Sequence, residues 1–356
     1  MFKKLLQKPF FIKLLNWEYW PFNVVYVPIY FYWLWLMIKA RSAFFFNTSN
    51  PLIKNGGFLL ESKKEIYDLI PSGYYPATLF FKHDCSVEEV INTVKIKGLQ
   101  FPLIAKPDVG MRGLLVQKIE SEKELKEYAC SNKVNFLVQD FIEYENEVGL
   151  FYYRYPGQEK GNISGIVGKE FLSVTGDGIS TIEQLLQKDQ RFILQLPVLK
   201  ETHKDSLQII LKKEKQQLLV PYGNHCRGSK FSDISNLIDE ELVRSIDAVC
   251  KQIPSFYFGR MDIRYSNWED LKHGKKFSII ELNGAGSEPT HIYDPRHSIF
   301  FAWKEIIRHL NILYKISVLN HKVLQMPFMN FSAGIKMLKE NTEYVKIISM
   351  PLKRTA

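Results

Sequence analysis

The sequence has 356 residues, of which 46% are hydrophobic and 24% charged, so it can form one large or two moderate folded domains and is not disordered in composition. Its net charge of +9 fits an anionic membrane, nucleic acid or a phosphate-bearing small molecule as partner. The sequence has no zinc-finger, helix-turn-helix or aromatic RNA-binding pattern and no CxxC pair among its four cysteines, so we expect no nucleic-acid partner, zinc site or disulfide framework.

Residues 1–57 form an aromatic and basic segment. The uncharged, aromatic run of residues 21–38 is followed by Lys39 and Arg41. As a helix it would be about 27 Å long, short for a bilayer core of about 30 Å, and Pro28 lies in its middle. We therefore expect this segment to lie in, or dip into, the cytoplasmic leaflet of the membrane. The alternatives are an aromatic cover over a soluble core and a homodimer interface.

A strand, a flexible glycine loop and a second strand are predicted for residues 103–119. Lys106 ends the first strand, and Gly110 and Gly113 lie in the loop. Backbone N–H groups in such a loop can face phosphates, and Lys106 would add a point charge. The loop is not a Walker loop, because no GKS or GKT follows. A plain β-turn is the alternative.

The next strand, residues 136–142, is apolar and ends in a polar turn that contains Glu147. Further strands are predicted within residues 148–174. The donor-rich loop PYGNHCRG, residues 221–228, holds His225 and Arg227. His225 could be a base or a ligand, but a lone histidine is more often structural.

Two strands joined by a polar loop are predicted for residues 256–283. Because strand side chains alternate, Arg260, Asp262 and Arg264 share one face of the first strand. Glu281 and Asn283 share one face of the second. If the strands pair, two carboxylates and an amide converge, and such hard oxygen ligands suit magnesium. The alternative is an ordinary hairpin with solvated acids. A long helix follows at residues 298–318, and residues 321–356 form a C-terminal helical extension.

Five motifs in this order resemble the ATP-grasp superfamily of carboxylate–amine ligases, which includes cyanophycin synthetase, glutathione ligases and D-alanine–D-alanine ligases. They are ESK with YPAT, PLIAKPDVGMRG, LVQDFIEYENEV, GRMD and IIELN, and they span residues 61–283. The resemblance implies an α+β fold in which two subdomains with antiparallel sheets clamp a nucleotide. The ATP-grasp domain would comprise residues 58–320, with a nucleotide-covering subdomain at about 98–175.

The resemblance also implies a set of site residues. Lys63 and Lys106 would contact the phosphates of ATP, and the third cation would be Lys169 or Arg227. Gln139, Phe141 and Ile142 would hold adenine, and Glu147 the ribose. Asp262, Glu281 and Asn283 would bind Mg²⁺ or Mn²⁺. Arg260 and Arg227 would stabilise charge that develops during the reaction. Gln139 departs from the family, which often has Glu there.

The implied activity is ATP-dependent formation of an amide from a small-molecule carboxylate and an amine through an acyl phosphate. If the N-terminal segment is a membrane anchor, a membrane-proximal or lipid-linked substrate is implied, and the protein would be peripheral on the inner face of the cytoplasmic membrane. A kinase of the same superfamily and a non-catalytic, membrane-docked nucleotide-binding protein are the alternatives.

Overall fold

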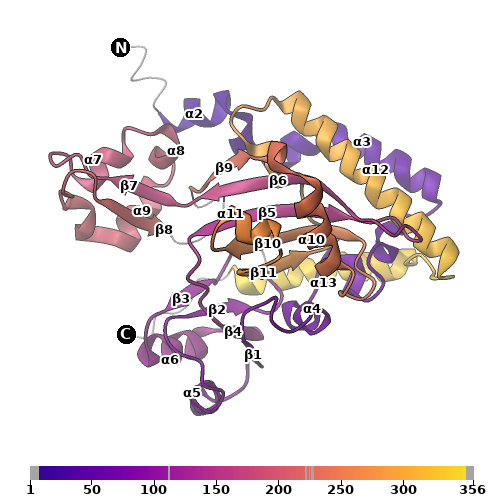
Figure 1. The fold of residues 1–356 in the computed structure, drawn as a ribbon, viewed down its shortest axis with the longest axis horizontal. Helices are drawn as coiled ribbons and strands as arrows, with labels where there is room; N and C mark the ends of the chain where they lie inside the picture. The colour runs from indigo at the N-terminus through magenta and orange to yellow at the C-terminus, as the bar shows by residue number, and fades with distance from the viewer. Residues whose placement is uncertain (1–7, 111–112, 221–222, 224, 226–227, 350–356) are drawn as a thin grey trace.

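The computed structural model describes residues 8–110, 113–220, 223, 225 and 228–349. A five-stranded antiparallel sheet lies at its centre, a four-stranded antiparallel sheet lies below it, and a two-stranded sheet stands to one side with its own helices (Figure 1). This α+β arrangement of two antiparallel sheets is the fold class predicted from the sequence, and that prediction is confirmed.

The four-stranded sheet has the strand order β1-β4-β2-β3. Its strands are β1 (Thr78–Phe81), β2 (Leu103–Pro107), β3 (Gln117–Ile119) and β4 (Phe136–Asp140), and its helices are α5 (Val87–Ile96) and α6 (Glu122–Ser131). The small subdomain therefore covers residues 78–140. The sequence placed it at about 98–175, but β5 and β6, which lie in that range, belong to the larger sheet.

Alternation along these strands determines which side chains face the larger sheet. Leu103 and Ala105 of β2 are fully buried in the core beneath α5 and α6. Ile104 and Lys106 therefore point to the opposite face. Leu137 and Gln139 of β4 point the same way, and Leu137 joins the core of the larger sheet.

The five-stranded sheet has the order β11-β10-β5-β6-β9. Its strands are β5 (Asn146–Tyr153), β6 (Asn162–Glu170), β9 (Lys230–Asp233), β10 (Phe258–Tyr265) and β11 (Phe277–Asn283). Helices α10 (Glu240–Cys250) and α11 (Trp268–Lys272) cover one face, where Met261 and Ile263 join the core. Arg260, Asp262 and Arg264 lie on the other face, as their alternation in the sequence predicted.

The N-terminal segment is part of the same folded body. It forms α2 (Pro9–Leu15), η1 (Trp17–Tyr19) and α3 (Phe22–Ala40), and α3 runs through Pro28 without a break. One side of α3 packs on α12 (Ile299–Val323), where Trp303 Nε1 donates to the carbonyl of Val25 at 2.8 Å. Tyr32 donates to Asn311 Oδ1 at 2.6 Å. This side of α3 is thus an aromatic cover over a core helix.

The other side of α3 is exposed and apolar. Val27, Phe31, Leu34, Trp35 and Ile38 are each between 46% and 72% exposed. Within the described ranges, α3 is the one helix long and apolar enough to cross a membrane, judged by length and composition.

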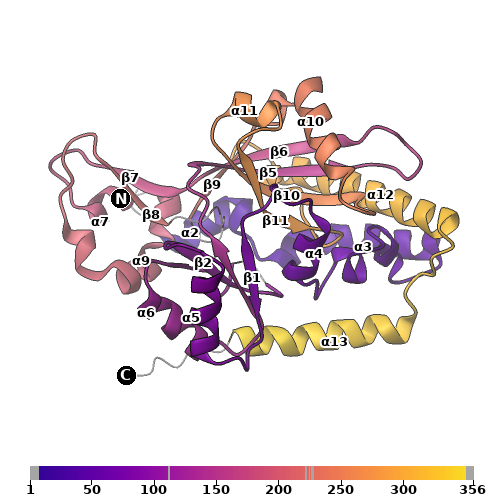
Figure 2. The same cartoon turned by 60° about the horizontal axis from the view of Figure 1, so that its bottom comes forward.

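Helix α13 (Phe331–Ile348) connects the C-terminal part of the chain to the small subdomain. Figure 2 shows it running beneath α12 toward the four-stranded sheet. Tyr344 near its end donates to the carbonyl of Val109, just after β2, at 2.6 Å. Because α12 ends at Val323, the expected extension at residue 321 begins inside its last turn.

A small module beside the larger sheet has its own core, in which Leu172, Leu186 and Leu199 are buried. Its elements are β7 (Leu172–Thr175), α7 (Ile182–Leu186), α8 (Gln190–Ile193), α9 (Leu196–His203), η4 (Lys204–Gln208) and β8 (Gln216–Val220). The remaining short helices are η2 (Phe45–Thr48), η3 (Lys54–Gly57), α4 (Lys63–Leu69), η6 (Ser235–Leu237) and η7 (Thr290–Tyr293).

Candidate active site

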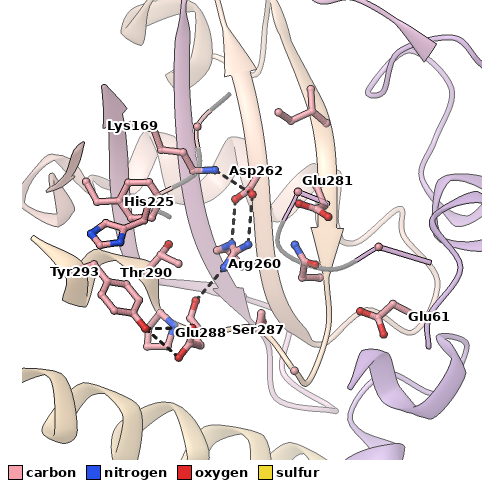
Figure 3. A pocket seen from close by; sticks show the side chains of 18 of the residues that line it. Glu61, Lys169, His225, Arg260, Asp262, Glu281, Ser287, Glu288, Thr290 and Tyr293 are labelled. Atoms are coloured by element: carbon pink, nitrogen blue, oxygen red, sulfur yellow. Dashed lines mark hydrogen bonds and ion pairs between the residues drawn. The ribbon is translucent and has the colours of Figure 1, made fainter. Parts of the chain in front are cut away.

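A cavity of about 830 Å³ lies between the two large sheets. Strands β2 and β4 contribute one wall, and β5, β6, β10 and β11 contribute the facing wall. Helices α3 and α12 close one end. Its volume is in the range of cavities that bind ligands of cofactor size. Figure 3 shows the part of the cavity where acidic and basic side chains meet.

Two carboxylates face each other across neighbouring strands in this cavity. Asp262 on β10 and Glu281 on β11 are register partners. Arg260 pairs with Asn283, two residues away along each strand. Register partners place their side chains on the same face of a sheet. The convergence of Asp262, Glu281 and Asn283 predicted from the sequence is therefore present. The solvated-hairpin alternative does not hold for Asp262, which is buried, whereas the side chain of Glu281 is 34% exposed.

Two cations hold Asp262 in its ionised form. Arg260 Nε lies 3.0 Å from Asp262 Oδ1, and Lys169 Nζ lies 3.0 Å from Asp262 Oδ2 (Figure 3). Burial by itself would raise the pKa of Asp262, but the charges of Arg260 and Lys169 lower it below its ordinary value. Glu281 follows the same pattern: burial opposes ionisation, and Lys63, 3.5 Å away, contributes most to lowering its pKa.

The donor set around the two acids fits a divalent cation. Among the described residues, the buried Nδ2 of Asn283 has no hydrogen-bond partner, so no hydrogen bond holds this end of the amide in place. In the described parts of the chain, no three His, Cys, Asp or Glu side chains gather as a metal-binding group. A metal here would therefore have two carboxylates and one amide, which suits Mg²⁺ completing its shell with phosphate and water.

Lys106 connects the two sheets across the cavity. Its Nζ donates to Tyr67 Oη of α4 at 2.9 Å and to the carbonyl of Ile280 on β11 at 3.1 Å. Burial lowers its pKa to about 8. A phosphate placed beside it would therefore find a cation that is only weakly hydrated and aimed at the acids on the facing sheet.

Lys63 is positioned by the end of β2. It is the first residue of α4, whose N-cap Ser62 donates its hydroxyl to Asp108 Oδ1 at 2.9 Å. The backbone N–H of Lys63 donates to the carbonyl of Asp108 at 3.1 Å. An ideal Cβ on Gly110 would lie 2.5 Å from Lys63 Nζ, so the ammonium lies directly against the glycine loop.

The other end of the cavity holds the three residues predicted to bind adenine. Gln139 is buried and donates its amide to Thr78 Oγ1 at 2.7 Å, which fixes its orientation. The ring of Phe141 has Lys118 Nζ 4.6 Å from its centre. The carbonyl of Ile142 accepts from Arg264 Nη1 at 3.0 Å. All three residues predicted to hold adenine line the cavity.

Glu147 lies inside an ion-pair network. Its carboxylate accepts from Lys169 at 2.8 Å and from Arg264 at 3.4 Å. Burial alone would lower the pKa of Lys169, but Asp262 and Glu147 raise it above its usual value. Lys169 is thus charged, and it pairs with both Glu147, which is predicted to bind ribose, and Asp262, which is predicted to bind the metal.

The donor-rich loop is described only in part. Arg227, predicted as a catalytic residue, lies outside the described residues. His225 has its Nε2 2.9 Å from Glu18 Oε2 and its ring 5.3 Å from that of Tyr293. Glu18 also binds Arg191 at 3.2 Å. His225 is therefore held by the N-terminal segment, which favours a structural role.

Sequence reasoning missed a contact between the N-terminal helix and the site. The hydroxyl of Tyr26 on α3 donates to the carboxylate of Glu288, which lies in the loop after β11. Tyr293 also donates to Glu288, at 3.3 Å (Figure 3). Arg260 Nη1 is 3.5 Å from the Glu288 carbonyl. No local signal in the sequence reveals this contact, because Tyr26 and Glu288 are 262 positions apart.

The sequence matches no protein-family model and no curated protein. Among solved structures, the chain is similar to the D-alanine–D-alanine ligase from Bacillus anthracis, at 13% identity and a TM-score of 0.41, over 73% of this chain and 68% of that one. It is similar to VanG D-Ala:D-Ser ligase from Enterococcus faecalis at 15% identity and a TM-score of 0.38, over 76% and 62%. For a bifunctional glutathione synthetase from Pasteurella multocida, identity is 14% and the TM-score 0.37, over 73% of this chain and 36% of that one. The chain thus spans just over a third of that synthetase's length.

The two large sheets and the site share one arrangement. Two antiparallel sheets face one cavity, with paired acids on adjacent strands of one sheet and a lysine on the other. This is the arrangement that the resemblance of the five sequence motifs to the ATP-grasp superfamily implied.

Proposed function

We propose that this protein is an ATP-dependent carboxylate–amine ligase. The observation that carries the proposal is the pairing of Asp262 with Glu281 on adjacent strands, facing Lys63 and Lys106 across one cavity. Paired acids opposite clustered cations suit a magnesium–triphosphate complex, where positioning and charge neutralisation dominate catalysis.

The proposed roles follow the position of each side chain. Asp262, Glu281 and Asn283 hold Mg²⁺ or Mn²⁺, which when bound neutralises phosphate charge. Lys63, Lys106 and Lys169 contact the phosphates, with Arg227 as the alternative third cation. Gln139, Phe141 and Ile142 hold adenine, and Glu147 the ribose.

Arg260 orients the substrate carboxylate toward the terminal phosphate. The carboxylate oxygen attacks that phosphorus and ADP leaves, which gives an acyl phosphate. The amine then attacks the acyl carbon and forms the C–N bond. The C–O bond to phosphate breaks, phosphate leaves with its electron pair, and the nitrogen loses a proton. Arg260 stabilises the negative oxygen of the tetrahedral intermediate, and Arg227 is a second candidate for stabilising the charge that develops on the phosphate.

The test is ADP release in a screen of amino acids, polyamines and lipid extracts, followed by mass spectrometry of the product. Asp262→Asn with Glu281→Gln should abolish release while the secondary structure measured by circular dichroism stays intact. Glu201→Gln with Asp205→Asn, two exposed acids of the small module, is the matched control. Unchanged turnover in the first double variant would exclude this site. A phosphorylated product without amide, formed when amine is omitted, would identify a kinase instead.

We also propose that the exposed face of α3 docks on an anionic cytoplasmic leaflet. This face carries Phe31 at 72% and Ile38 at 68% exposure, and Lys39 and Arg41 follow it. Apolar insertion and basic flanks together give peripheral binding. Since the opposite side of α3 holds α12, the helix would lie along the surface.

Flotation with anionic and zwitterionic vesicles tests the docking. Phe31→Glu with Ile38→Glu should abolish binding to anionic vesicles. Ile179→Glu, at an equally exposed position of the small module, should not change it. Equal flotation of both variants would contradict the proposal.

A further inference from the structure

The cavity continues beyond the reacting groups into an apolar arm between α3 and α12. We define this apolar arm by Val25, Ile29, Trp33, Phe58, Leu310 and Leu313, all of which line the same cavity as Asp262 and Glu281. We propose that one of the two substrates is an amphiphile whose reacting head lies beside Arg260 and whose unbranched apolar chain fills the apolar arm. This inference rests on the proposed ligase function and specifies its substrate class.

A single strand face sets the order of the groups. Phe258, Arg260, Asp262 and Arg264 alternate along β10 and so lie in a row, spaced about 6.6 Å apart. Arg264 lies at the adenine end, Asp262 at the metal position, and Phe258 is buried against the apolar arm. A chain attached to a group at Arg260 therefore reaches the apolar arm at the next position along the strand.

The apolar arm offers almost nothing for a polar substrate to bind. Val25, Ile29 and Leu313 line it with purely apolar side chains, and Trp33 contacts the rings of Phe45 and Phe58. On α12, His309 also lines the cavity, and burial lowers its pKa to about 3, so it is neutral. Apolar surface of this kind gains from covering methylene groups at about 0.8 kcal/mol each.

The apolar arm opens beside the exposed face of α3. Phe22 and Tyr30 line the cavity and are also 40% and 47% exposed, so they mark its rim on this helix. Tyr30 is three residues from Val27 and adjacent to Phe31, and both of these residues face outward. A chain could thus pass from a docked lipid surface into the apolar arm, while its head lies beside Arg260, whose Nη1 is 3.5 Å from the carbonyl of Glu288.

The first experiment measures ADP release by the full chain in two series. One series uses acetate, octanoate and palmitate, each with an excess of ethanolamine. The other uses ethylamine, octylamine and hexadecylamine, each with an excess of acetate. We expect kcat/KM to rise at least about tenfold from the shortest to the longest member of one series. Release that is independent of chain length in both series would overturn the inference and leave the ligase function intact.

The second experiment changes the apolar arm itself. Leu310→Trp should fill it and lower kcat/KM for the long-chain substrate at least about tenfold, with turnover of the short-chain substrate retained. Leu310→Ala should enlarge the apolar arm and raise kcat/KM for long chains that carry a terminal branch. Leu338→Trp, at a residue on α13 that is 39% exposed, is the matched control. Equal losses in Leu310→Trp and Leu338→Trp would contradict the inference.

Binding without turnover separates the two proposals. A fluorescent analogue of palmitate should bind the full chain without nucleotide, and Leu310→Trp should weaken this binding where Leu338→Trp does not. Probe binding without ADP release from any substrate would reject the ligase and keep the apolar arm as a lipid site. ADP release without probe binding would keep the ligase function and reject the apolar arm as a lipid site.

Discussion

The ammonium of Lys169 lies 3.0 Å from the carboxylate of Asp262, although strand β5 runs between their two strands. The residue of β5 that lies between them is Gly149, which pairs with Asp262 on one side and Val167 on the other. An ideal Cβ on Gly149 would lie 3.2 Å from Asp262 Oδ1 and 2.9 Å from Val167 Cγ1. The missing side chain therefore leaves room for the ion pair to cross the sheet.

Gly149→Ala should disturb the site from inside the sheet. The added methyl group overpacks against Val167 and reduces the space beside Asp262, so we expect a loss of about 1–3 kcal/mol in the free energy of unfolding and a fall in ADP release. Gly168→Ala on β6, whose Cβ would have no neighbour closer than 3.5 Å, is the control. Chemical denaturation of both variants would show whether they differ.

Lys169→Met should leave two buried acids without their shared cation. Asp262 and Glu147 would then repel each other in a poorly solvated place, and removing one partner of a buried ion pair typically costs about 3–5 kcal/mol. ADP release should fall with stability. Lys230→Met breaks an exposed pair with Glu170 and should cost less than about 1 kcal/mol. Similar urea midpoints for the two variants would argue that Lys169 is not coupled to these acids.

Tyr26→Phe tests whether the N-terminal helix positions the active-site loop. The change removes one hydroxyl that donates to Glu288, and we expect turnover to fall about tenfold, which corresponds to about 1.4 kcal/mol, with little change in unfolding. Tyr30→Phe, one turn along α3, removes a hydroxyl bonded to Asn23 and is the control. The kcat and KM of both variants decide the matter, and equal values would show that Tyr26 has no positioning role.

His309 should make the fold sensitive to mild acid. Burial lowers its pKa from 6.5 to about 3, so below pH 6.5 the unfolded chain binds a proton that the folded chain does not. Stability should therefore fall by about 1.4 kcal/mol for each pH unit from 6.5 downward, until the folded-state pKa is reached.

His309→Gln should flatten this slope between pH 6.5 and about 4.5. Below about pH 4.5 Glu305 also contributes to the slope, because the folded state lowers the pKa of that carboxyl from 4.5 to about 2. His83→Gln, a change of an exposed histidine, is the control. Denaturant unfolding at several pH values measures the slope, and parallel curves for wild type and His309→Gln would contradict the prediction.

Much of the candidate site could be predicted because it depends on local pattern. Residues 256–283 read as two strands, and a side-chain period of two is enough to put Arg260 and Asp262 on one face. The four-stranded sheet was less predictable, since β3 is only three residues long and the loop that precedes it obscured where the strand begins. The boundary of the small subdomain was misplaced because the sequence of a strand does not show which of the two sheets the strand joins.

By itself, the sequence determined the two-stranded acidic unit, Lys106 at the end of the strand before the glycine loop, and the aromatic N-terminal helix, because each depends on residues within a few positions of one another. Only the tertiary structure decided that Lys169 crosses the sheet to Asp262, that Tyr26 binds Glu288, and that α3 and α12 enclose an apolar arm continuous with the acids. The physical reason is that alternation and helical periodicity are local properties of the chain, whereas contacts between segments far apart in the sequence depend on how whole elements pack.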